Sequence, residues 1–326
     1  MVNNGRIDVE ERPMPVPGTG EVLVRVSGAG LNRADLMQRA GFYPAPPGSP
    51  ADIPGLEFAG VVEALGPDAV GVAVGDRVFG VVGGGAQAEY VTVHASHCAR
   101  VPDTLDLVVA GGVPEAFVTA HDAMVSRARV TPGEWVLVHA VGSGVGTAAL
   151  QLATAFGCPV VGTARSAEKL ERCSDLGLVD AVVPARHDDG RLDVAATATA
   201  IRACAADGID VTLELVGGDY LGLDLQVAAL HGRIVLIGTL AGGRTEFDIL
   251  AAMQRQLEVH GTVLRPRNVA DKAAATAAFT HDVVPLLADG RIAPVVDRVF
   301  PLADAQAAYE LLASDSTFGT LILDCA

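Results

Sequence analysis

The sequence has few basic residues. It contains 23 lysines and arginines against 39 aspartates and glutamates, so its formal net charge at pH 7 is −16. A chain this acidic repels polyanions, and neither a nucleic acid nor an anionic membrane surface is expected as a partner. Aromatic residues make up only 4% of the chain although 50% of its residues are hydrophobic, so small aliphatic side chains must fill its cores.

Cysteine is also scarce. The five cysteines are scattered, and no C-x-x-C pair occurs among them. Isolated thiols are typical of a reducing compartment. The N-terminal stretch MVNNGRIDVEERP is charged early and lacks the apolar segment of a secretory signal. Together these features predict a cytoplasmic protein.

The longest stretch without a charged residue runs from Trp135 to Ala164. Glycines at 142, 144 and 146 interrupt it, so a membrane span is not indicated. The stretch instead predicts a strand over Trp135–Ala140, a helix over Thr147–Phe156 and a second strand over Pro159–Thr163. A βαβ unit buried on both faces explains the missing charges.

The three glycines Gly142, Gly144 and Gly146 predict a phosphate site. Glycine lets the backbone turn tightly and approach a ligand, and the first N–H groups of the following helix have no partner within it. The spacing departs from G-x-G-x-x-G, but its position between a strand and a helix favours dinucleotide binding over an ordinary tight turn.

The end of the second strand indicates which dinucleotide binds. An NAD site usually has an acidic residue about 20 residues past the first glycine, which bonds the ribose 2′-hydroxyl. Here Arg165, Ser166 and Lys169 occupy that region. Two cations and a hydroxyl suit a 2′-phosphate, so we expect NADPH. The alternative is that the cations are solvated charges at a helix start.

The rest of the chain has two different patterns. Up to about residue 115 it is mostly β, with strands over Val22–Val26, Gly60–Leu65, Asp76–Val82 and Glu89–Val93, and helices over Leu31–Arg39, Asp103–Ala110 and Glu115–Ala128. After Ala164, strands at Ala181–Pro184, Gly208–Val216 and Gly232–Gly238 alternate with helices at Ala167–Asp175, Val194–Ala205, Tyr220–Leu230 and Ile249–Val259. This alternation predicts a doubly wound parallel sheet.

The tail departs from this alternation, with helices over Ala270–Leu287 and Ala303–Ala313 and strands over Ala293–Phe300 and Gly319–Asp324. We expect a catalytic domain at 1–115, an NADP-binding Rossmann domain at 116–262, and a return to the catalytic domain at 263–326. The active cleft should then lie between the two lobes.

These segments resemble the zinc-free medium-chain dehydrogenase/reductases, in the zeta-crystallin-like quinone oxidoreductase branch, and most of all its inducible quinone reductase subgroup. The similar segments are Gly30–Arg39 with Gly41-Phe42-Tyr43, Pro54–Gly60, Gly75–Val78, Ala88–Val91, Pro114–Phe117 and His139–Gly146 with Gln151. The resemblance implies a GroES-like catalytic domain beside the Rossmann domain, and a homodimer.

Zinc is not expected. Alcohol dehydrogenases of this superfamily have a zinc-binding cysteine and histidine where Leu31–Asn32 and Leu56 stand here, and leucine cannot ligate a metal. The cluster of His94, His97 and Cys98 has no partner pair with finger-like spacing. Without a Lewis acid, alcohol oxidation is a poor fit. The expected reaction is therefore NADPH-dependent hydride transfer to a quinone or an activated enone.

The resemblance also assigns roles. It places Asn32 and Tyr43 beside the nicotinamide and substrate as catalytic residues, although an N-cap and a loop anchor are their simpler interpretations. It gives cofactor contacts to Asn32, Thr119, Gly142, Ser143, Gly144, Val145, Gly146, Val216, Gly238, Leu240 and Arg265. Arg265 could also be an exposed helix-end cation. Glu214 could be a satisfied buried acid, and His139 is expected to be a packed core histidine.

Two other functions remain open. One is an enoyl-thioester reductase like those in polyketide synthases, which have a lysine soon after the glycine of the fifth strand, whereas Gly238-Thr239-Leu240 stands here. The other is a non-catalytic NADPH-binding protein.

Overall fold

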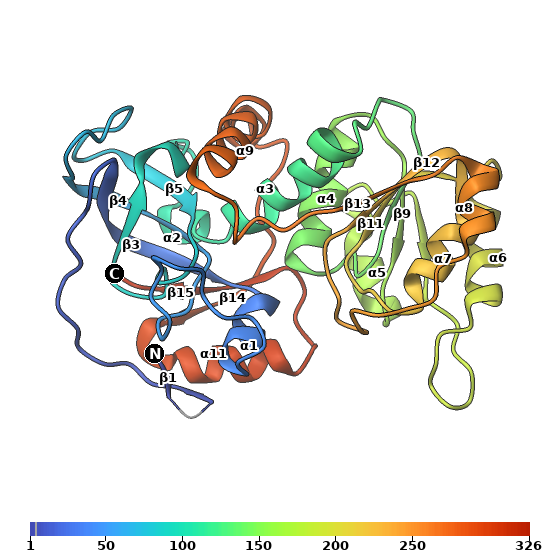
Figure 1. The fold of residues 1–326 in the computed structure, drawn as a ribbon, viewed down its shortest axis with the longest axis horizontal. Helices are drawn as coiled ribbons and strands as arrows, with labels where there is room; N and C mark the ends of the chain where they lie inside the picture. The colour runs from blue at the N-terminus through green and yellow to red at the C-terminus, as the bar shows by residue number, and fades with distance from the viewer. Residues whose placement is uncertain (4) are drawn as a thin grey trace. The chain divides into compact units, whose positions relative to one another are not determined.

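The computed structural model describes residues 1–3 and 5–326, and the chain forms two compact units. Unit 1 comprises Met1–Thr119 and Leu264–Ala326, and unit 2 comprises Ala120–Val263. Unit 1 contains a seven-stranded sheet and a separate pair of strands, β1 and β2, and unit 2 contains a six-stranded sheet, so the two units are described in turn (Figure 1).

Unit 2 contains a six-stranded, fully parallel sheet with the strand order β10-β9-β8-β11-β12-β13 (Figure 1). The strands are β8 (Val136–Val138), β9 (Val160–Thr163), β10 (Asp180–Val182), β11 (Ile209–Glu214), β12 (Ala228–Leu236) and β13 (Glu258–Gly261). The helices are α4 (Gly144–Ala155), α5 (Ala167–Ser174), α6 (Val194–Cys204), α7 (Tyr220–Val227) and α8 (Ile249–Arg255). The predicted doubly wound parallel sheet is confirmed, and its strand order reverses between β8 and β11, where ligands bind in such sheets.

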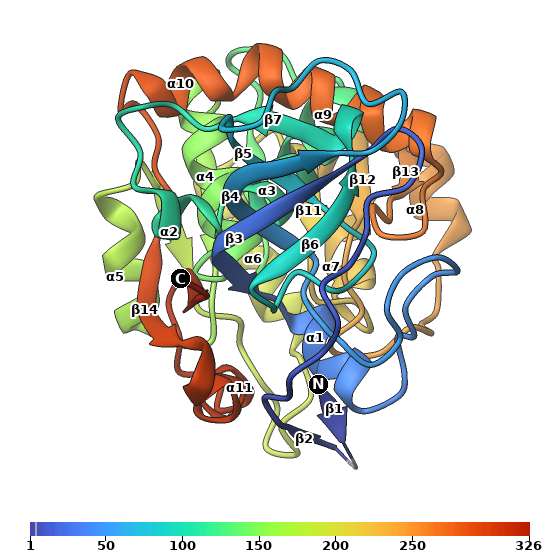
Figure 2. The same ribbon diagram turned by 90° about the vertical axis from the view of Figure 1, so that its left-hand side faces the viewer.

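Unit 1 is mostly β, as predicted. Its main sheet has the order β14-β15-β3-β4-β5-β7, with β6 paired to β3 (Figure 2). The strands are β1 (Val2–Asn3), β2 (Arg6–Ile7), β3 (Glu21–Leu31), β4 (Glu57–Leu65), β5 (Arg77–Val81), β6 (Tyr90–His94), β7 (Cys98–Arg100), β14 (Val296–Pro301) and β15 (Thr320–Asp324). The tail strand β15 pairs antiparallel with β3, with Leu321 opposite Leu31.

The helices of unit 1 are short except for α9. They are α1 (Arg33–Arg39), α2 (Leu107–Ala110), α9 (Val269–Asp282), α10 (Val284–Ala288) and α11 (Ala305–Ala313), while α3 (Pro114–His121) crosses the boundary between the units.

Small aliphatic side chains fill both cores, in keeping with the low aromatic content. In unit 1, valines and leucines of β3, β4 and β15 surround Phe58 and Tyr309, both of which are fully buried. In unit 2, Leu137 and Val161 of the sheet pack with Ile201 of α6. Close packing of this kind lets helices lie directly on the sheets.

Several predicted helices are interrupted or shorter in the structure. The helix expected over Glu115–Ala128 is α3 followed by a π-helical turn at Asp122–Arg127. The helix expected over Ala270–Leu287 is divided at Val283, because Pro285 has no N–H to donate to the preceding turn. Between Asp103 and Ala110 only Leu107–Ala110 is helical, with Asp106 capping its first turn.

Two errors concern the end of unit 2. The helix predicted over Tyr220–Leu230 stops at Val227, and β12 begins at Ala228. The helix predicted over Ile249–Val259 stops at Arg255, because Gln256 adopts a left-handed conformation with φ 52°. The edge strand β13 follows at once.

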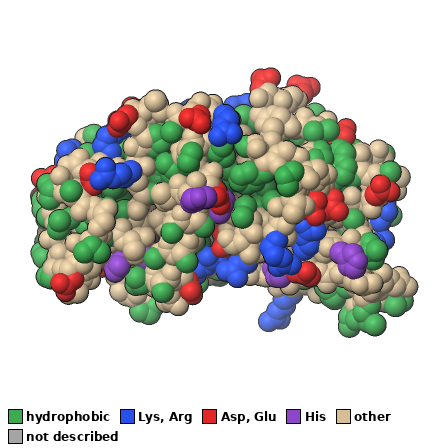
Figure 3. All heavy atoms as spheres, turned by 90° about the horizontal axis from the view of Figure 1, so that it is seen from above, with side chains coloured by type: hydrophobic (Ala, Val, Ile, Leu, Met, Phe, Trp, Pro, Cys, Tyr) green, Lys and Arg blue, Asp and Glu red, His purple; other side chains and the backbone are tan. Residues whose placement is uncertain are grey.

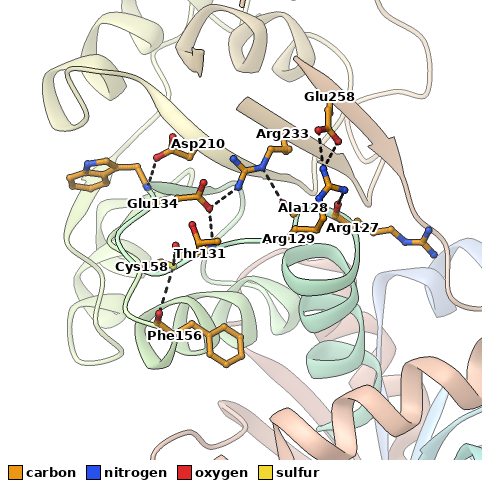
Figure 4. Close-up of polar contacts among 11 residues, drawn as sticks. Arg127, Ala128, Arg129, Thr131, Glu134, Phe156, Cys158, Asp210, Arg233 and Glu258 are labelled. Atoms are coloured by element: carbon orange, nitrogen blue, oxygen red, sulfur yellow. Dashed lines mark hydrogen bonds and ion pairs between the residues drawn. The ribbon is translucent and has the colours of Figure 1, made fainter. Parts of the chain in front are cut away.

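At the end of the unit 2 sheet opposite the glycine turn, ion pairs and hydrogen bonds join the segment before β8 to β12 and β13 (Figure 4). The Arg233 guanidinium in β12 donates to the Ala128 carbonyl at 3.0 Å and to Glu134 Oε2 at 2.6 Å, and Glu134 also accepts the Thr131 N–H at 2.7 Å. Nearby, Arg129 pairs with Glu258 at 2.7 Å in a more exposed position. These contacts hold the segment before β8 to β12 and β13.

On the face of the molecule drawn in Figure 3, acidic and basic side chains lie in small groups among hydrophobic and neutral ones. Within the described residues, no helix has both the length and the apolar character needed to cross a membrane.

Candidate functional site

The glycine turn of unit 2 leads directly into a capped helix. Helix α4 begins at Gly144, and the Oγ of its N-cap Ser143 accepts the Gly146 N–H at 3.1 Å. The Thr147 N–H donates to the Ser143 carbonyl at 2.8 Å. Of the first helical N–H groups, those of Gly144 and Val145 have no partner within the helix, as expected for such a terminus. Both residues are partly exposed, so an anion could reach them.

Gly146 allows the helix to lie close to the turn that precedes it. A Cβ at this position would lie 2.4 Å from the Ala140 carbonyl oxygen and 2.7 Å from Val141 atoms, which no side chain tolerates. Gly142 is buried. The last glycine of the motif therefore allows the helix to pack closely against the turn.

The three residues expected to select the cofactor gather at the carboxyl end of β9, the strand next to β8. Arg165 is exposed, while Ser166 and Lys169 are partly buried. The Ser166 Oγ caps α5 by accepting the Lys169 N–H at 3.3 Å. The two cations thus stand at the same edge of the sheet as the glycine turn, where a 2′-phosphate could be held.

The loops after β11 and β12 are joined to one another. The Ala241 N–H donates to the Val216 carbonyl at 2.7 Å, and the Gly218 N–H donates to the Gly242 carbonyl at 3.0 Å. A Cβ on Gly238 would lie 2.3 Å from the Leu215 carbonyl oxygen, so the close approach of the loops requires glycine there. Val216 and Gly238 are partly exposed, and the Leu240 side chain is 56% exposed.

Behind the first of these loops lies a buried cluster of His139, Glu214 and Asp224. His139 Nε2 lies 2.8 Å from Asp224 Oδ1 and 3.7 Å from Glu214 Oε2. His139 Nδ1 lies 2.8 Å from the Thr163 hydroxyl. All three side chains are fully buried, so the expected core histidine has two acidic neighbours.

In unit 1, Asn32 occupies the N-cap position of α1, but its side chain contacts a buried acid. Its amide Nδ2 donates to Glu57 Oε1 at 2.8 Å, and Glu57 Oε2 accepts the Glu115 N–H at 2.8 Å. A Cβ on Gly30 would lie 2.1 Å from Glu57 Oε1, so glycine makes room for the carboxyl group. The orientation of the Asn32 amide is therefore set by Glu57.

Burial raises the pKa of Glu57 to about 8, although the hydrogen bond from Asn32 acts in the opposite direction. Burial likewise raises the pKa of Asp35 to about 6 and that of Glu115 to about 7. Three acidic groups with raised pKa values therefore lie around Asn32.

Tyr43 and Arg265 form one assembly. The Arg265 guanidinium lies over the Tyr43 ring, 4.8 Å from its centroid, and donates to the Tyr43 carbonyl at 2.8 Å. It also donates to the Gly83 carbonyl at 2.7 Å and to Gln38 Oε1 at 2.5 Å. Arg265 is only 4% exposed. It is not an exposed helix-end cation, because its hydrogen bonds join three segments of unit 1.

The sequence patterns of two families match the chain. Residues 18–103 match the alcohol dehydrogenase GroES-like domain, and residues 144–278 match the family described as zinc-binding dehydrogenase. The quinone oxidoreductase of Sus scrofa is 30% identical over 312 residues, which cover 95% of this chain and 91% of that protein. The synaptic vesicle membrane protein VAT-1 homolog-like of Mus musculus is 30% identical, covering 98% and 78% respectively.

The chain belongs to the medium-chain dehydrogenase/reductases, in the quinone oxidoreductase branch. Solved structures of this family share its fold. A quinone oxidoreductase of Pseudomonas syringae has a TM-score of 0.83 at 27% identity, covering 97% of this chain and 94% of that one. A mycobacterial protein complexed with NADPH has a TM-score of 0.81 at 28% identity, covering 96% and 94%.

This medium-chain dehydrogenase/reductase is also similar to part of a polyketide synthase. A mycocerosic acid synthase-like polyketide synthase of Mycobacterium tuberculosis is 31% identical over 309 residues, which cover 94% of this chain but only 14% of the synthase. The similarity is therefore to one segment of a much larger protein.

Sequence reasoning gave no role to Glu57, Asp35, Glu115 or Asp224 of this reductase-family chain. A signal was present, because Glu57 stands in the apolar run Leu56-Glu57-Phe58-Ala59 and Asp224 stands between Leu223 and Leu225. An acid inside an apolar segment is buried only with a partner. Its partner, however, lies far away in the sequence.

Proposed function

We propose that this chain catalyses NADPH-dependent, zinc-independent transfer of hydride to a quinone or an activated enone. The observation that carries the proposal is the pair of cations at the end of β9. Arg165 follows β9, the strand adjacent to β8, and Lys169 lies in the first turn of α5, where an NAD-selective site would have an acid. The similarity to a mycobacterial protein complexed with NADPH supports the same cofactor.

The residues that the family resemblance assigns to this cofactor are part of the proposal. In unit 2, Gly142, Ser143, Gly144, Val145 and Gly146 would hold the pyrophosphate, with Arg165, Ser166 and Lys169 at the 2′-phosphate and Val216, Gly238 and Leu240 beside the nicotinamide. Thr119, which is half-buried in α3, would lie near the carboxamide. NADPH supplies hydride when bound, and the protein orients the reactants and excludes water.

Asn32 and Tyr43 are the residues that we propose to contact the acceptor. Asn32 offers an amide that Glu57 fixes in one orientation, and Tyr43 offers a hydroxyl on a ring that Arg265 holds by stacking. Burial raises the pKa of the Tyr43 phenol, so it remains a neutral hydrogen-bond donor at physiological pH. Such groups can bond a carbonyl oxygen of the acceptor as negative charge develops on it.

The proposal of zinc independence rests on donor chemistry. Leu56 is 1% exposed and stands where zinc-dependent relatives would need a histidine. Leucine offers no lone pair, and the amide of Asn32 is already engaged with Glu57. A quinone or an activated enone accepts hydride without a Lewis acid, which makes it the acceptor class that these residues suit.

A spectrophotometric assay tests this function. Loss of NADPH absorbance is measured with a small quinone, an enone, an enoyl-CoA and a simple aldehyde, in protein dialysed against chelator and again with added Zn²⁺. We expect turnover with the quinone or enone, with NADPH preferred to NADH and no stimulation by zinc. Faster turnover of the enoyl-CoA would favour the second function below.

An enoyl-thioester reductase is the second candidate, favoured by the similarity to a polyketide synthase segment. The sequence Gly238-Thr239-Leu240 argues against this function, because it lacks the lysine expected of such enzymes. A non-catalytic NADPH-binding protein is the third. It would bind NADPH in a calorimeter yet consume none with any acceptor.

We also propose that the protein is a cytoplasmic homodimer joined through unit 2. All five cysteines are free, which suits a reducing compartment. The edge strand β13 is largely exposed, and Phe247, Ile249, Leu250 and Met253 near it are exposed hydrophobic residues. Unpaired edges invite a second strand. Light scattering should give twice the chain mass, and Val259→Pro, which removes an edge N–H, should reduce it to one chain.

A further inference from the structure

The cluster of His139, Glu214 and Asp224 has two buried oxygen atoms without a hydrogen-bond partner among the described residues. They are Glu214 Oε2 and Asp224 Oδ2. Each carboxyl group is otherwise engaged, since Asp224 Oδ1 contacts His139 Nε2 at 2.8 Å and Glu214 Oε1 accepts backbone N–H groups. Buried oxygens of this kind are rarely left unpaired, so we expect a proton or a metal ion between them.

A shared proton is a better partner for these two oxygen atoms than a metal ion is. The three side chains could present ligand atoms within 4.8 Å of one another. A metal would, however, have to displace the short contact between His139 and Asp224, and full burial leaves no exposed face for its entry. A carboxylic acid of Glu214 that donates its proton from Oε2 to Asp224 would give both oxygens a partner.

The remaining protons then follow. The His139 Nε2–H donates to Asp224 Oδ1, and the Thr163 hydroxyl donates to His139 Nδ1. The cluster carries a single negative charge in this arrangement. Burial, and then the charge of Asp224, raises the pKa of Glu214, and burial lowers the pKa of His139. Both shifts favour the same arrangement at neutral pH.

Glu214 also holds the loop that follows β11. Its Oε1 accepts the Val216 N–H at 2.5 Å and the Gly217 N–H at 2.7 Å. Its backbone carbonyl accepts the Ile237 N–H at 2.8 Å and the Gly238 N–H at 3.1 Å. One residue therefore fixes the first part of both loops assigned to the nicotinamide side.

We propose that Glu214 is a positioning residue for the loop Val216–Gly218, held in place by a proton that it shares with Asp224, and that the loss of this proton at alkaline pH loosens the loop and weakens cofactor binding. The inference rests on the proposed NADPH-dependent function. It deepens that function by naming what orders one wall of the site.

The groups facing Glu214 come from three elements. His139 follows β8, Asp224 and Tyr220 belong to α7, and Thr163 ends β9. The Tyr220 ring packs edge-on against His139 at 4.9 Å between centroids, and the charges of Arg186 and Arg165 act on its phenol. Ionisation of both acids would place two negative charges in this buried space. Repulsion between these charges would displace the Glu214 side chain and disturb its hydrogen bonds to the Val216 and Gly217 N–H groups.

The experiment measures NADPH affinity by calorimetry from about pH 7 to about pH 9.5, where the 2′-phosphate, with its second pKa near 6, no longer titrates. In the wild type we expect the Kd to rise by at least about fivefold as the shared proton is lost. Glu214→Gln mimics the protonated acid at every pH, because its NH2 donates to Asp224. In this variant the rise should shrink to less than about twofold.

Asp224→Asn tests the partner in the same way, since its amide can donate to an ionised Glu214, and it too should flatten the profile. Asp210→Asn is the matched control. Asp210 lies in the same strand and binds the Trp135 N–H at its other end, so this variant should keep the wild-type profile. An equally steep rise in Glu214→Gln, or none in the wild type, overturns the proposal.

Hydrogen exchange separates this inference from the proposed function. Protection of the Val216 and Gly217 amides should fall at alkaline pH in the wild type and stay constant in Glu214→Gln, with or without cofactor. If NADPH binds at no pH, the proposed function fails, and these amides still decide the inference. Protection that is independent of pH in both proteins overturns it.

Discussion

At the scale of single residues, Arg265 shows that a buried cation can have a structural role where its sequence context suggests ligand binding. Its sequence context, Leu264-Arg265-Pro266-Arg267, suggested a ligand for a cofactor phosphate. In the structure its guanidinium donates to the Tyr43 carbonyl, the Gly83 carbonyl and Gln38. A fork of fixed donors can satisfy three acceptors at once, which the ammonium of lysine cannot do in the same geometry. These contacts favour a role in holding the Tyr43 loop.

Substitutions at Arg265 and Tyr43 should separate loop placement from chemistry. Arg265→Ala removes the donor of two buried acceptors and one partly buried acceptor, and it should cost about 2–4 kcal/mol of stability. It should raise the KM for the acceptor while changing the Kd for NADPH by less than about threefold. Tyr43→Phe keeps the stacked ring and should lower kcat with little loss of stability. Denaturant unfolding and steady-state kinetics measure both.

Arg267→Ala is the matched control for the loss of one positive charge, and it should leave the KM for the acceptor close to the wild-type value. If Arg265→Ala instead weakens NADPH binding tenfold or more at unchanged KM for the acceptor, Arg265 contacts the phosphate after all.

The proposed preference for NADPH gives a second prediction about individual side chains. Arg165→Asp combined with Lys169→Ala removes two cations from the end of β9 and introduces an acid. A hydrogen bond to a charged group is worth about 1.5–3 kcal/mol, so the loss of even one such bond should lower the preference for NADPH over NADH by a factor of at least about 10. The ratio of kcat/KM for the two nucleotides measures it. Arg186→Ala, a nearby exposed cation that binds the Gly190 carbonyl, serves as the comparison, and unchanged selectivity in the double variant would place the 2′-phosphate elsewhere.

At the scale of elements, sequence patterns predicted the strands and helices that have local signals. The strand, helix and strand around the glycine turn and the alternation after Ala164 have such local signals, and the structure contains them. One error occurred where a non-local contact decided the outcome. Ala228–Leu230 reads as a continuation of α7, yet it forms the start of β12, because Ala228 pairs with Ile209 of β11. Helical and strand periodicities do not differ over three residues.

The candidate site was predictable to the same extent. The positions of Asn32 and Tyr43 followed from a resemblance, but the contact of Asn32 with Glu57 joins residues 25 apart, and that of His139 with Asp224 joins residues 85 apart. Spacing within one element cannot reveal such pairs. A buried acid in an apolar run indicates that it has a partner, but the sequence does not identify that partner.

The ion pairs at the end of the unit 2 sheet opposite the glycine turn should differ in how much they stabilise the protein. The Arg233 and Glu134 side chains are 13% and 22% exposed, whereas those of Arg129 and Glu258 are 59% and 46% exposed. Arg233→Ala should therefore destabilise the protein by about 2–4 kcal/mol, because it leaves a partly buried carboxylate and the Ala128 carbonyl without their donor. Arg129→Ala should cost less than about 1 kcal/mol.

Urea unfolding followed by the fluorescence of Trp135, the single tryptophan, measures both variants. Its backbone N–H is bonded to Asp210 in β11, so it reports on this sheet. Equal losses in the two variants would show that burial does not decide the strength of these pairs.

At the scale of the whole chain, composition sets the electrostatic behaviour. The net charge of −16 keeps the surface acidic, and the repulsion among these charges grows as remaining acids ionise. In most proteins, buried acids are paired with cations and their pKa values are lowered, so stability falls in acid. Here burial raises the pKa of Asp35, Glu115 and Glu57 to about 6, 7 and 8 respectively.

The sign of the pH dependence follows from these shifts. An acid whose pKa is higher in the folded than in the unfolded protein binds its proton more tightly when folded, so its contribution to stability is present below the unfolded pKa and is lost as the pH rises through the folded value. The apparent melting temperature should therefore fall between about pH 5.5 and about pH 8.5. Glu57→Gln removes one titrating group and should make the fall smaller. Differential scanning calorimetry in buffers of constant ionic strength measures it, and a melting temperature that rises over this range would mean that the acids of unit 1 are ionised in the folded protein.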